Sequence, residues 1–169
     1  QHIFIVRQYL LTRFSGERAM LKAVAAWVGA GDVLVTYNGK SFDLPLLTTR
    51  FRMAREADPL GPMPHLDLLY PVRRAFSRCW DDCRLARVER QLLGFHRRND
   101  LPGAEAPAVW FDWIRRGEAS RLPKVCRHNH WDLLSLALLL PLLADVYRNP
   151  GLHGADLRRA DRQSRIKYG

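Results

Sequence analysis

Residues 34–47 read LVTYNGKSFDLPLL, and this stretch decides the fold class. The short run at 32–37 is rich in β-branched residues and lies between turn residues, which predicts a buried strand. Asn38 and Gly39 then signal a turn. The apolar spacing over residues 42–55 predicts a helix. A buried strand, a tight turn and a helix in this order are typical of an α/β protein.

The end of that predicted strand is a candidate binding site. In open α/β sheets, ligands bind where strands end at the carboxyl edge. Asp43 follows that edge, and a carboxylate there can hold a divalent cation. The alternative is structural: Asp43 caps the helix and Asn38 serves only as a turn residue.

The remaining pattern supports the same fold class. The other predicted elements are a strand at 3–11, a strand end or helix entry at 65–70, and helices at 17–28, 71–78, 83–94, 110–116 and 124–147. This order predicts an α/β structure with helices on both faces of a small sheet. Only two or three strands are found, fewer than such a sheet usually contains.

Length and charge limit the class of protein. The 169 residues, 47% of them hydrophobic, suffice for one domain, which we place at 1–150, followed by a basic tail at 151–169 that we expect to be mobile. Lys and Arg exceed Asp and Glu by 27 − 17 = +10, which favours a polyanionic partner such as nucleic acid. Arg accounts for 23 of these cations, and such a bias can also reflect genome composition, so a merely solvated basic surface stays an alternative.

Cysteine content and apolar runs indicate the compartment. Three cysteines are too few and too odd in number for a disulfide scaffold, so we expect a cytoplasmic protein. The longest apolar run, 133–144, is shorter than the roughly 20 residues that a bilayer span needs, so we expect no membrane partner. The sequence makes no prediction of oligomeric state.

A second candidate site lies at residues 128–132, which read HNHWD. On a helix, His128 and Asp132 are one turn apart on the same face. A carboxylate beside an apolar face is costly unless it is paired or binds a cation, and histidine can move a proton near neutral pH. The alternative is a solvated His–Asp pair at the start of a helix.

A zinc site is a rival interpretation of the same region. Cys79, Cys83, Cys126, His128 and His130 offer five soft ligands, and the spacing of the first two is permitted for zinc. A zinc-stabilised interaction domain is therefore a further hypothesis. Against it, cysteine is often only a small buried hydrophobic residue.

Together, the two sites resemble a known enzyme family. Residues 34–47 resemble the second exonuclease motif of the DEDD superfamily of 3′–5′ exonucleases, and residues 122–137, LPKVCRHNHWDLLSLA, resemble the third. The similarity is greatest to the YprB-type ribonuclease-H-like branch and covers roughly residues 1–147. Further positions that look like that branch are Gln8, Glu17, DLL at 67–69, DLPG at 100–103 and Pro107.

The resemblance implies a ribonuclease-H-like fold, with a mixed sheet between helices, and a two-metal phosphodiester hydrolase acting on single-stranded DNA or RNA 3′ ends with Mg²⁺ or Mn²⁺. Asp43 and Asp132 become metal ligands and His128 the candidate general base. Asn38 and Phe42 would hold the 3′-terminal nucleotide. In the histidine form of the family the base usually lies five residues before the aspartate, which is Arg127 here, so the identity of the base is open. Asp67 is a weaker candidate, for which a structural role is favoured.

The sequence departs from the family at its first motif. An Asp-x-Glu strand normally supplies two of four carboxylates, and none precedes Ile3, where 3–11 resembles the family's third strand. Either the chain is a fragment, or it is a degenerate nucleic-acid-binding module without catalysis. We favour the fragment, because loss of a central strand exposes its neighbours. In either case two clear carboxylates are too few for a complete two-metal site.

Overall fold

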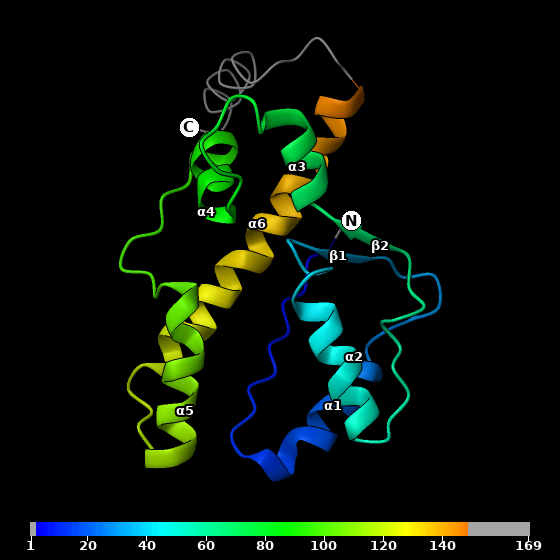
Figure 1. The fold of residues 1–169 in the computed structure, drawn as a ribbon, viewed down its shortest axis with the longest axis vertical. Coiled ribbons are helices and arrows are strands. Elements are labelled where there is room, and N and C mark those ends of the chain that lie inside the picture. Colours follow the sequence, from blue (N-terminus) through cyan, green and yellow to red (C-terminus); the bar gives the residue numbers. More distant parts are fainter. Residues whose placement is uncertain (1–2, 149–169) are drawn as a thin grey trace.

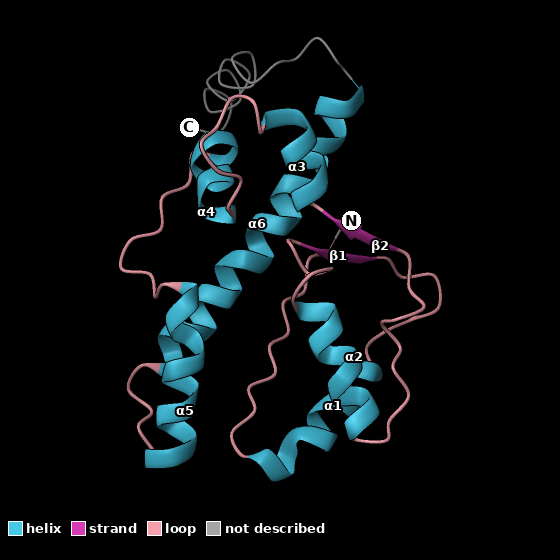
Figure 2. Cartoon of the chain, viewed as in Figure 1, coloured by secondary structure: helices cyan, strands magenta, loops and turns pink. Residues whose placement is uncertain are grey.

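The computed structural model describes residues 3–148, so the predicted tail at 151–169 lies outside the described residues. The elements are η1 (Phe14–Gly16), α1 (Glu17–Ala25), β1 (Leu34–Thr36), α2 (Asp43–Met53), β2 (His65–Asp67), α3 (Leu69–Phe76), α4 (Leu85–Val88), η2 (Glu89–Leu93), η3 (Gly103–Glu105), α5 (Ala106–Arg116) and α6 (Leu122–Arg148). Two helical arms flank a small sheet: α1 and α2 form one arm, and α5 and α6 form the other (Figures 1 and 2).

The described part of the sheet is a parallel pair. Leu34 of β1 lies opposite His65 of β2, and Thr36 lies opposite Asp67. Both strands therefore end at the same edge, where α2 and α3 begin. The predicted strand–turn–helix unit is present, and the predicted α/β class is confirmed.

The strand predicted at 3–11 is wrong. The segment is extended but pairs with no strand among residues 3–148, and Ile3, Phe4 and Ile5 are mostly exposed. It runs between the two arms (Figure 1). Side chains hold it instead: Gln8 Nε2 donates to the Cys126 carbonyl at 2.7 Å. Its apolar pattern gives it strand propensity, but a strand forms only where a neighbour completes the hydrogen-bond ladder.

Three hydrophobic clusters hold the described residues together, and the largest joins α3, α4 and α6. Its buried members are Leu68, Val72, Phe76, Val88, Leu139 and Leu143. A second cluster packs α1 against α2, through Leu21, Phe51 and Leu60. A third packs α5 against the start of α6, through Leu101, Val109 and Leu122.

Helix α6 spans two of these clusters. Among the described residues it is the one helix long and apolar enough to cross a membrane by length and composition. One such helix is weak evidence, because the core helix of a soluble protein passes the same test. Of its apolar window, 17% is buried, and Ser135, Leu139 and Leu143 are among the buried residues of the helix.

The loop after β1 is fixed by a buried carboxylate. Asp67, only 2% exposed, accepts hydrogen bonds from the backbone N–H groups of Asn38 at 2.6 Å, Lys40 at 3.0 Å and Leu69 at 3.1 Å. Asn38 adopts a left-handed φ of 64°. A Cβ at Gly39 would lie 2.6 Å from the Thr36 side chain, so only glycine allows this close turn.

We expect Asp67→Ala to lower the free energy of unfolding by about 2–3 kcal/mol, because three backbone donors lose a charged acceptor. Urea unfolding of the variant measures this loss. The control is Asp112→Ala, which removes an exposed carboxylate on α5 and should change stability by no more than about 0.5 kcal/mol. Equal stability of the two variants would contradict the role of Asp67 in fixing the loop.

Candidate functional site

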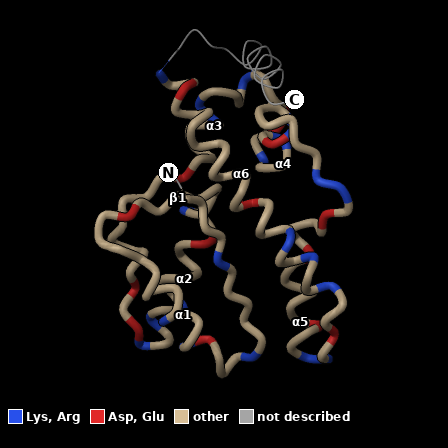
Figure 3. The backbone as a smooth tube through the Cα atoms, turned by 180° about the vertical axis from the view of Figure 1, so that it is seen from behind, with Lys and Arg blue, Asp and Glu red and all other residues tan. Residues whose placement is uncertain are grey.

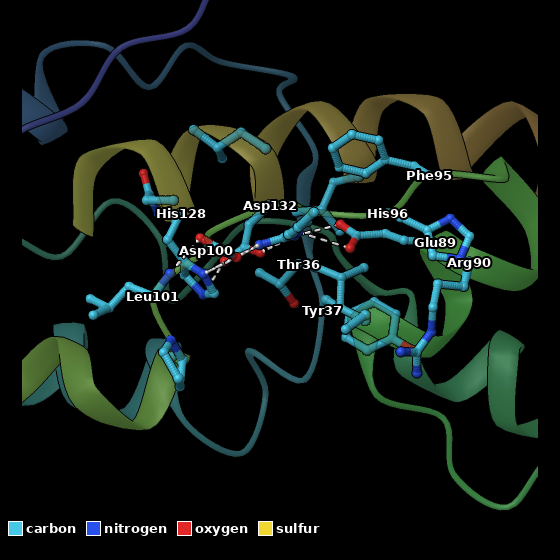
Figure 4. Close-up of a pocket in the computed structure, with 18 of the residues that line it drawn as sticks. Thr36, Tyr37, Glu89, Arg90, Phe95, His96, Asp100, Leu101, His128 and Asp132 are labelled. Atoms are coloured by element: carbon cyan, nitrogen blue, oxygen red, sulfur yellow. Dashed lines mark hydrogen bonds and ion pairs between the residues drawn. The ribbon is translucent and has the colours of Figure 1, made fainter. Parts of the chain in front are cut away.

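A hollow with a volume of about 680 Å³ brings the predicted site residues together. It lies between the end of β1, the start of α2, η2, the loop before α5, and α6 (Figure 4). Asp43, His128 and Asp132 all line it. Residues far apart in the chain, which the sequence analysis assigned to one site, thus share one pocket.

Two helices, α2 and α6, bring these side chains to the pocket. Asp43 is the first residue of α2, directly beyond the carboxyl end of β1. His128 and Asp132 are one turn apart on α6, and His128 Nε2 lies 3.6 Å from Asp132 Oδ2.

Asp43 is exposed and makes no hydrogen bond or ion pair with any residue of 3–148. The N-cap position of α2 is Phe42, and no side chain caps the helix. The capping bond that the structural alternative requires is therefore not formed within the described chain. A carboxylate lining a pocket without a protein partner is available to a cation.

Asp132 is held by a buried arginine. The side chain of Arg97 is 9% exposed and donates through Nη2 to Asp132 Oδ1 at 2.6 Å. The same guanidinium forms a two-pronged ion pair with Glu89, a residue of η2 that is only 1% exposed. Its Nη1 also lies 3.1 Å from Asp100 Oδ2. Burial lowers the pKa of Arg97, but the hydrogen bonds to Glu89 and Asp132 outweigh this and raise the pKa above its usual value.

The imidazole of His128 is oriented by a second carboxylate. Its Nδ1 lies 2.7 Å from Asp100 Oδ2 and 3.3 Å from Arg97 Nη1, while Nε2 lies 3.6 Å from Asp132 Oδ2, so charged groups on both sides hold the ring in place. Burial raises the pKa of Asp100, but its hydrogen bonds with His128 and Arg97 hold that pKa below its usual value. A Cβ at Gly103 would lie 3.2 Å from Nε2, so glycine lets the loop approach the ring closely.

Neither of the two residues expected to hold the terminal nucleotide, Asn38 and Phe42, lines the pocket of Asp43. Asn38 lines a second hollow and not the pocket of Asp43. Phe42 is 67% exposed and lines neither hollow. Arg127, the alternative position for the base, does not line the pocket and donates to the Asn99 carbonyl at 3.0 Å.

The described structure does not assemble the rival zinc site. Within residues 3–148, no three His, Cys, Asp or Glu side chains are grouped so that they could hold a metal. All three cysteines are free, and Cys79 is exposed. The zinc hypothesis therefore has no structural support.

Sequence reasoning missed Glu89 and Arg97. A glutamate within the apolar run LARVERQLL at 85–93 was the available signal, because a buried carboxylate requires a partner. No local pattern identifies that partner among 23 arginines. Glu89 also lies in a π-helical turn, a feature common at functional sites.

The donor chemistry fits Mg²⁺ or Mn²⁺, which prefer carboxylate oxygens. Asp43 has both oxygens unpaired within the described chain, and Asp132 has Oδ2 facing His128 rather than Arg97. Around Arg97 and His128, three carboxylates face one guanidinium, so the cluster retains negative charge while His128 is neutral. The residue types therefore suit such a cation, but no three such donors are grouped within residues 3–148.

A small parallel sheet with a pocket beyond its carboxyl edge defines an α/β protein with a candidate ligand site. Residues 1–144 match the model of the RNase_H superfamily, and the chain belongs to that superfamily. It is 38% identical over 135 residues to the uncharacterized protein YprB of Bacillus subtilis (strain 168), covering 79% of this chain. The chain spans about a third (32%) of that relative's length. No solved structure matches it significantly.

We expect Arg97→Met to lower the free energy of unfolding by about 3–5 kcal/mol, because it leaves Glu89 charged, buried and unpaired. The double variant Glu89→Gln/Arg97→Met should recover most of the loss, since the buried charge is gone. Urea unfolding measures both. As a control, Arg116→Met removes an exposed ion pair on α5 and should cost no more than about 1 kcal/mol. A double variant no more stable than Arg97→Met would refute this account.

Proposed function

We propose that this chain belongs to a metal-dependent 3′–5′ exonuclease that hydrolyses phosphodiester bonds at the ends of single-stranded DNA or RNA. The observation that carries the proposal is that Asp43, His128 and Asp132 line one pocket. Membership of the RNase_H superfamily supports a nucleic-acid substrate, and so does the net charge of +10.

Asp43 and Asp132 would hold Mg²⁺ or Mn²⁺ through their carboxylate oxygens. Two such cations, when bound, activate a water for attack and stabilise the leaving oxygen. The complete site needs two further carboxylates, which the family resemblance assigns to an Asp-x-Glu strand absent from these 169 residues. Arg97 fixes Asp132 by its Oδ1 atom, which leaves Oδ2 for the cation.

His128 would act as the general base. Asp100 engages Nδ1 and orients the ring. With the proton on Nδ1, the Nε2 lone pair would take a proton from the attacking water. In this arrangement Arg127 does not serve as the base, and its side chain instead donates a hydrogen bond to the Asn99 carbonyl.

A non-catalytic nucleic-acid-binding module is the second candidate. The observation in its favour is that three metal-binding side chains are not grouped among the described residues. The two candidates differ in one measurable respect. Binding by such a module would persist in EDTA and survive Asp43→Asn, and no hydrolysis would accompany it.

The intact protein with Mn²⁺ or Mg²⁺ should shorten a 5′-labelled single-stranded oligonucleotide to a ladder of products, and a nuclease-resistant 3′-terminal linkage should block it. Asp43→Asn and Asp132→Asn should each lower the rate by at least about 100-fold, because several kcal/mol of transition-state stabilisation depend on the cations. Gel electrophoresis of DNA and RNA substrates measures the rates.

The matched control is Asp112→Asn, which makes the same substitution on the surface of α5 and should retain full activity. His128→Gln should lower the rate by about 100-fold or more. Full activity in both Asp43→Asn and Asp132→Asn would exclude the exonuclease assignment. A wild-type protein that binds the oligonucleotide in EDTA but never cleaves it would favour the binding module.

A further inference from the structure

A second hollow, of about 560 Å³, lies beside the proposed catalytic pocket. Tyr37 and Leu85 line both hollows, so these two side chains form the divide between them. Asn38 lines the second hollow only. Its backbone is fixed by Asp67, so the loop that delivers Asp43 to one hollow presents Asn38 to the other.

Three arginines whose side chains are unpaired within the described chain line these two hollows. Arg73 on α3 and Arg84 before α4 line the second hollow, and Arg90 in η2 lines the first. None of their side chains makes an ion pair or hydrogen bond with residues 3–148. Lys and Arg are otherwise spread over the whole molecule (Figure 3), so what distinguishes these three is their place along adjoining hollows.

Two carboxylates, Asp81 and Asp82, also line the second hollow. Both are paired with one cation, Arg87, at 3.2 Å and 3.5 Å, so one negative charge is left over. Asp82 also accepts a hydrogen bond from the backbone N–H of Arg84 at 2.9 Å. Neither carboxylate forms an ion pair with the side chain of Arg73 or Arg84, so the two guanidinium groups outnumber the remaining acidic charge and are available to an external anion.

An aromatic ring completes the second hollow. Trp80 lines it and stacks on Phe76 with ring centroids 4.3 Å apart and an interplanar angle of 7°. Phe76 is buried in the largest cluster, so the indole is held in a fixed orientation and is only partly buried. Cationic side chains beside a fixed aromatic ring are the combination that binds single-stranded nucleic acid, through phosphates and bases respectively.

We propose that the second hollow is a binding site for single-stranded nucleic acid, in which Arg73 and Arg84 contact backbone phosphates and Trp80 contacts a base. The strand then passes over Tyr37 and beside Arg90 into the pocket of Asp43 and Asp132. The choice of nucleic acid as the occupant rests on the proposed function. The site itself needs no metal, so its binding can be measured without catalysis.

The test is fluorescence anisotropy of the intact protein with a fluorescein-labelled oligothymidylate of about 16 nucleotides, in EDTA. Arg73→Gln/Arg84→Gln should weaken binding about tenfold or more. It should also reduce the slope of log affinity against log salt concentration by about 0.7 for each phosphate that the variant no longer neutralises. Both side chains are exposed, so circular dichroism should show an unchanged fold.

The matched control is Arg74→Gln/Arg78→Gln. It removes the same charge from neighbouring positions in the chain, but neither side chain lines either hollow. Its affinity should stay within about twofold of wild type. Poly-glutamate at equal charge concentration should compete poorly, because it offers no bases to the Trp80 ring.

Equal losses in the two double variants, no loss in either, or no binding by the wild-type protein would each overturn the inference. Effective competition by poly-glutamate would assign the hollow to acidic protein segments instead. The inference and the proposed function fail separately. Arginine-dependent binding without cleavage would refute only the exonuclease, and cleavage by Arg73→Gln/Arg84→Gln with unchanged binding would refute only this site.

Discussion

The site depends on one buried guanidinium. Arg97 pairs with Glu89 from η2, Asp100 from its own loop and Asp132 from α6. Its planar fork satisfies the two oxygens of Glu89 and still reaches Asp132, which the single ammonium of lysine could not do. Hydrophobic contacts already join η2 and the Leu101 loop to α6. Arg97 adds an ionic link among all three segments, and the orientation of Asp132 follows from that network.

The same network sets the electrostatics of the pocket. Burying one guanidinium with three carboxylates is costly unless each charge is paired, and the cluster retains excess negative charge while His128 is neutral. Asp43 adds another carboxylate to the pocket lining, without a partner in the described chain. The lining of the pocket therefore carries excess negative charge, and Arg97 satisfies one oxygen of Asp132.

Local sequence patterns predicted part of this structure. The strand at β1, the turn at Asn38 and helix α2 were readable because each element leaves a signal within a few residues, and α6 was readable from its length and apolar composition. The strand predicted at 3–11 failed, since strand formation depends on a partner that the local pattern does not specify. Glu89 and Arg97 were missed for the same reason: a long-range ion pair leaves no periodicity. Whether Asp43 and Asp132 bind metal stays a prediction. Strand topology places Asp43 at the carboxyl edge, and the packing of α6 brings Asp132 to the same pocket.

Helix α6 contributes both to the pocket and to the core. Asp132 lies in its first half, and Leu139 and Leu143 in its second half belong to the cluster with α3 and α4. Asp132 and Leu143 are separated by about 16 Å along the axis at 1.5 Å per residue, with Pro141 inside the helix between them. A change in the packing of Leu139 or Leu143 can therefore reach the lining of the pocket through the backbone of one helix.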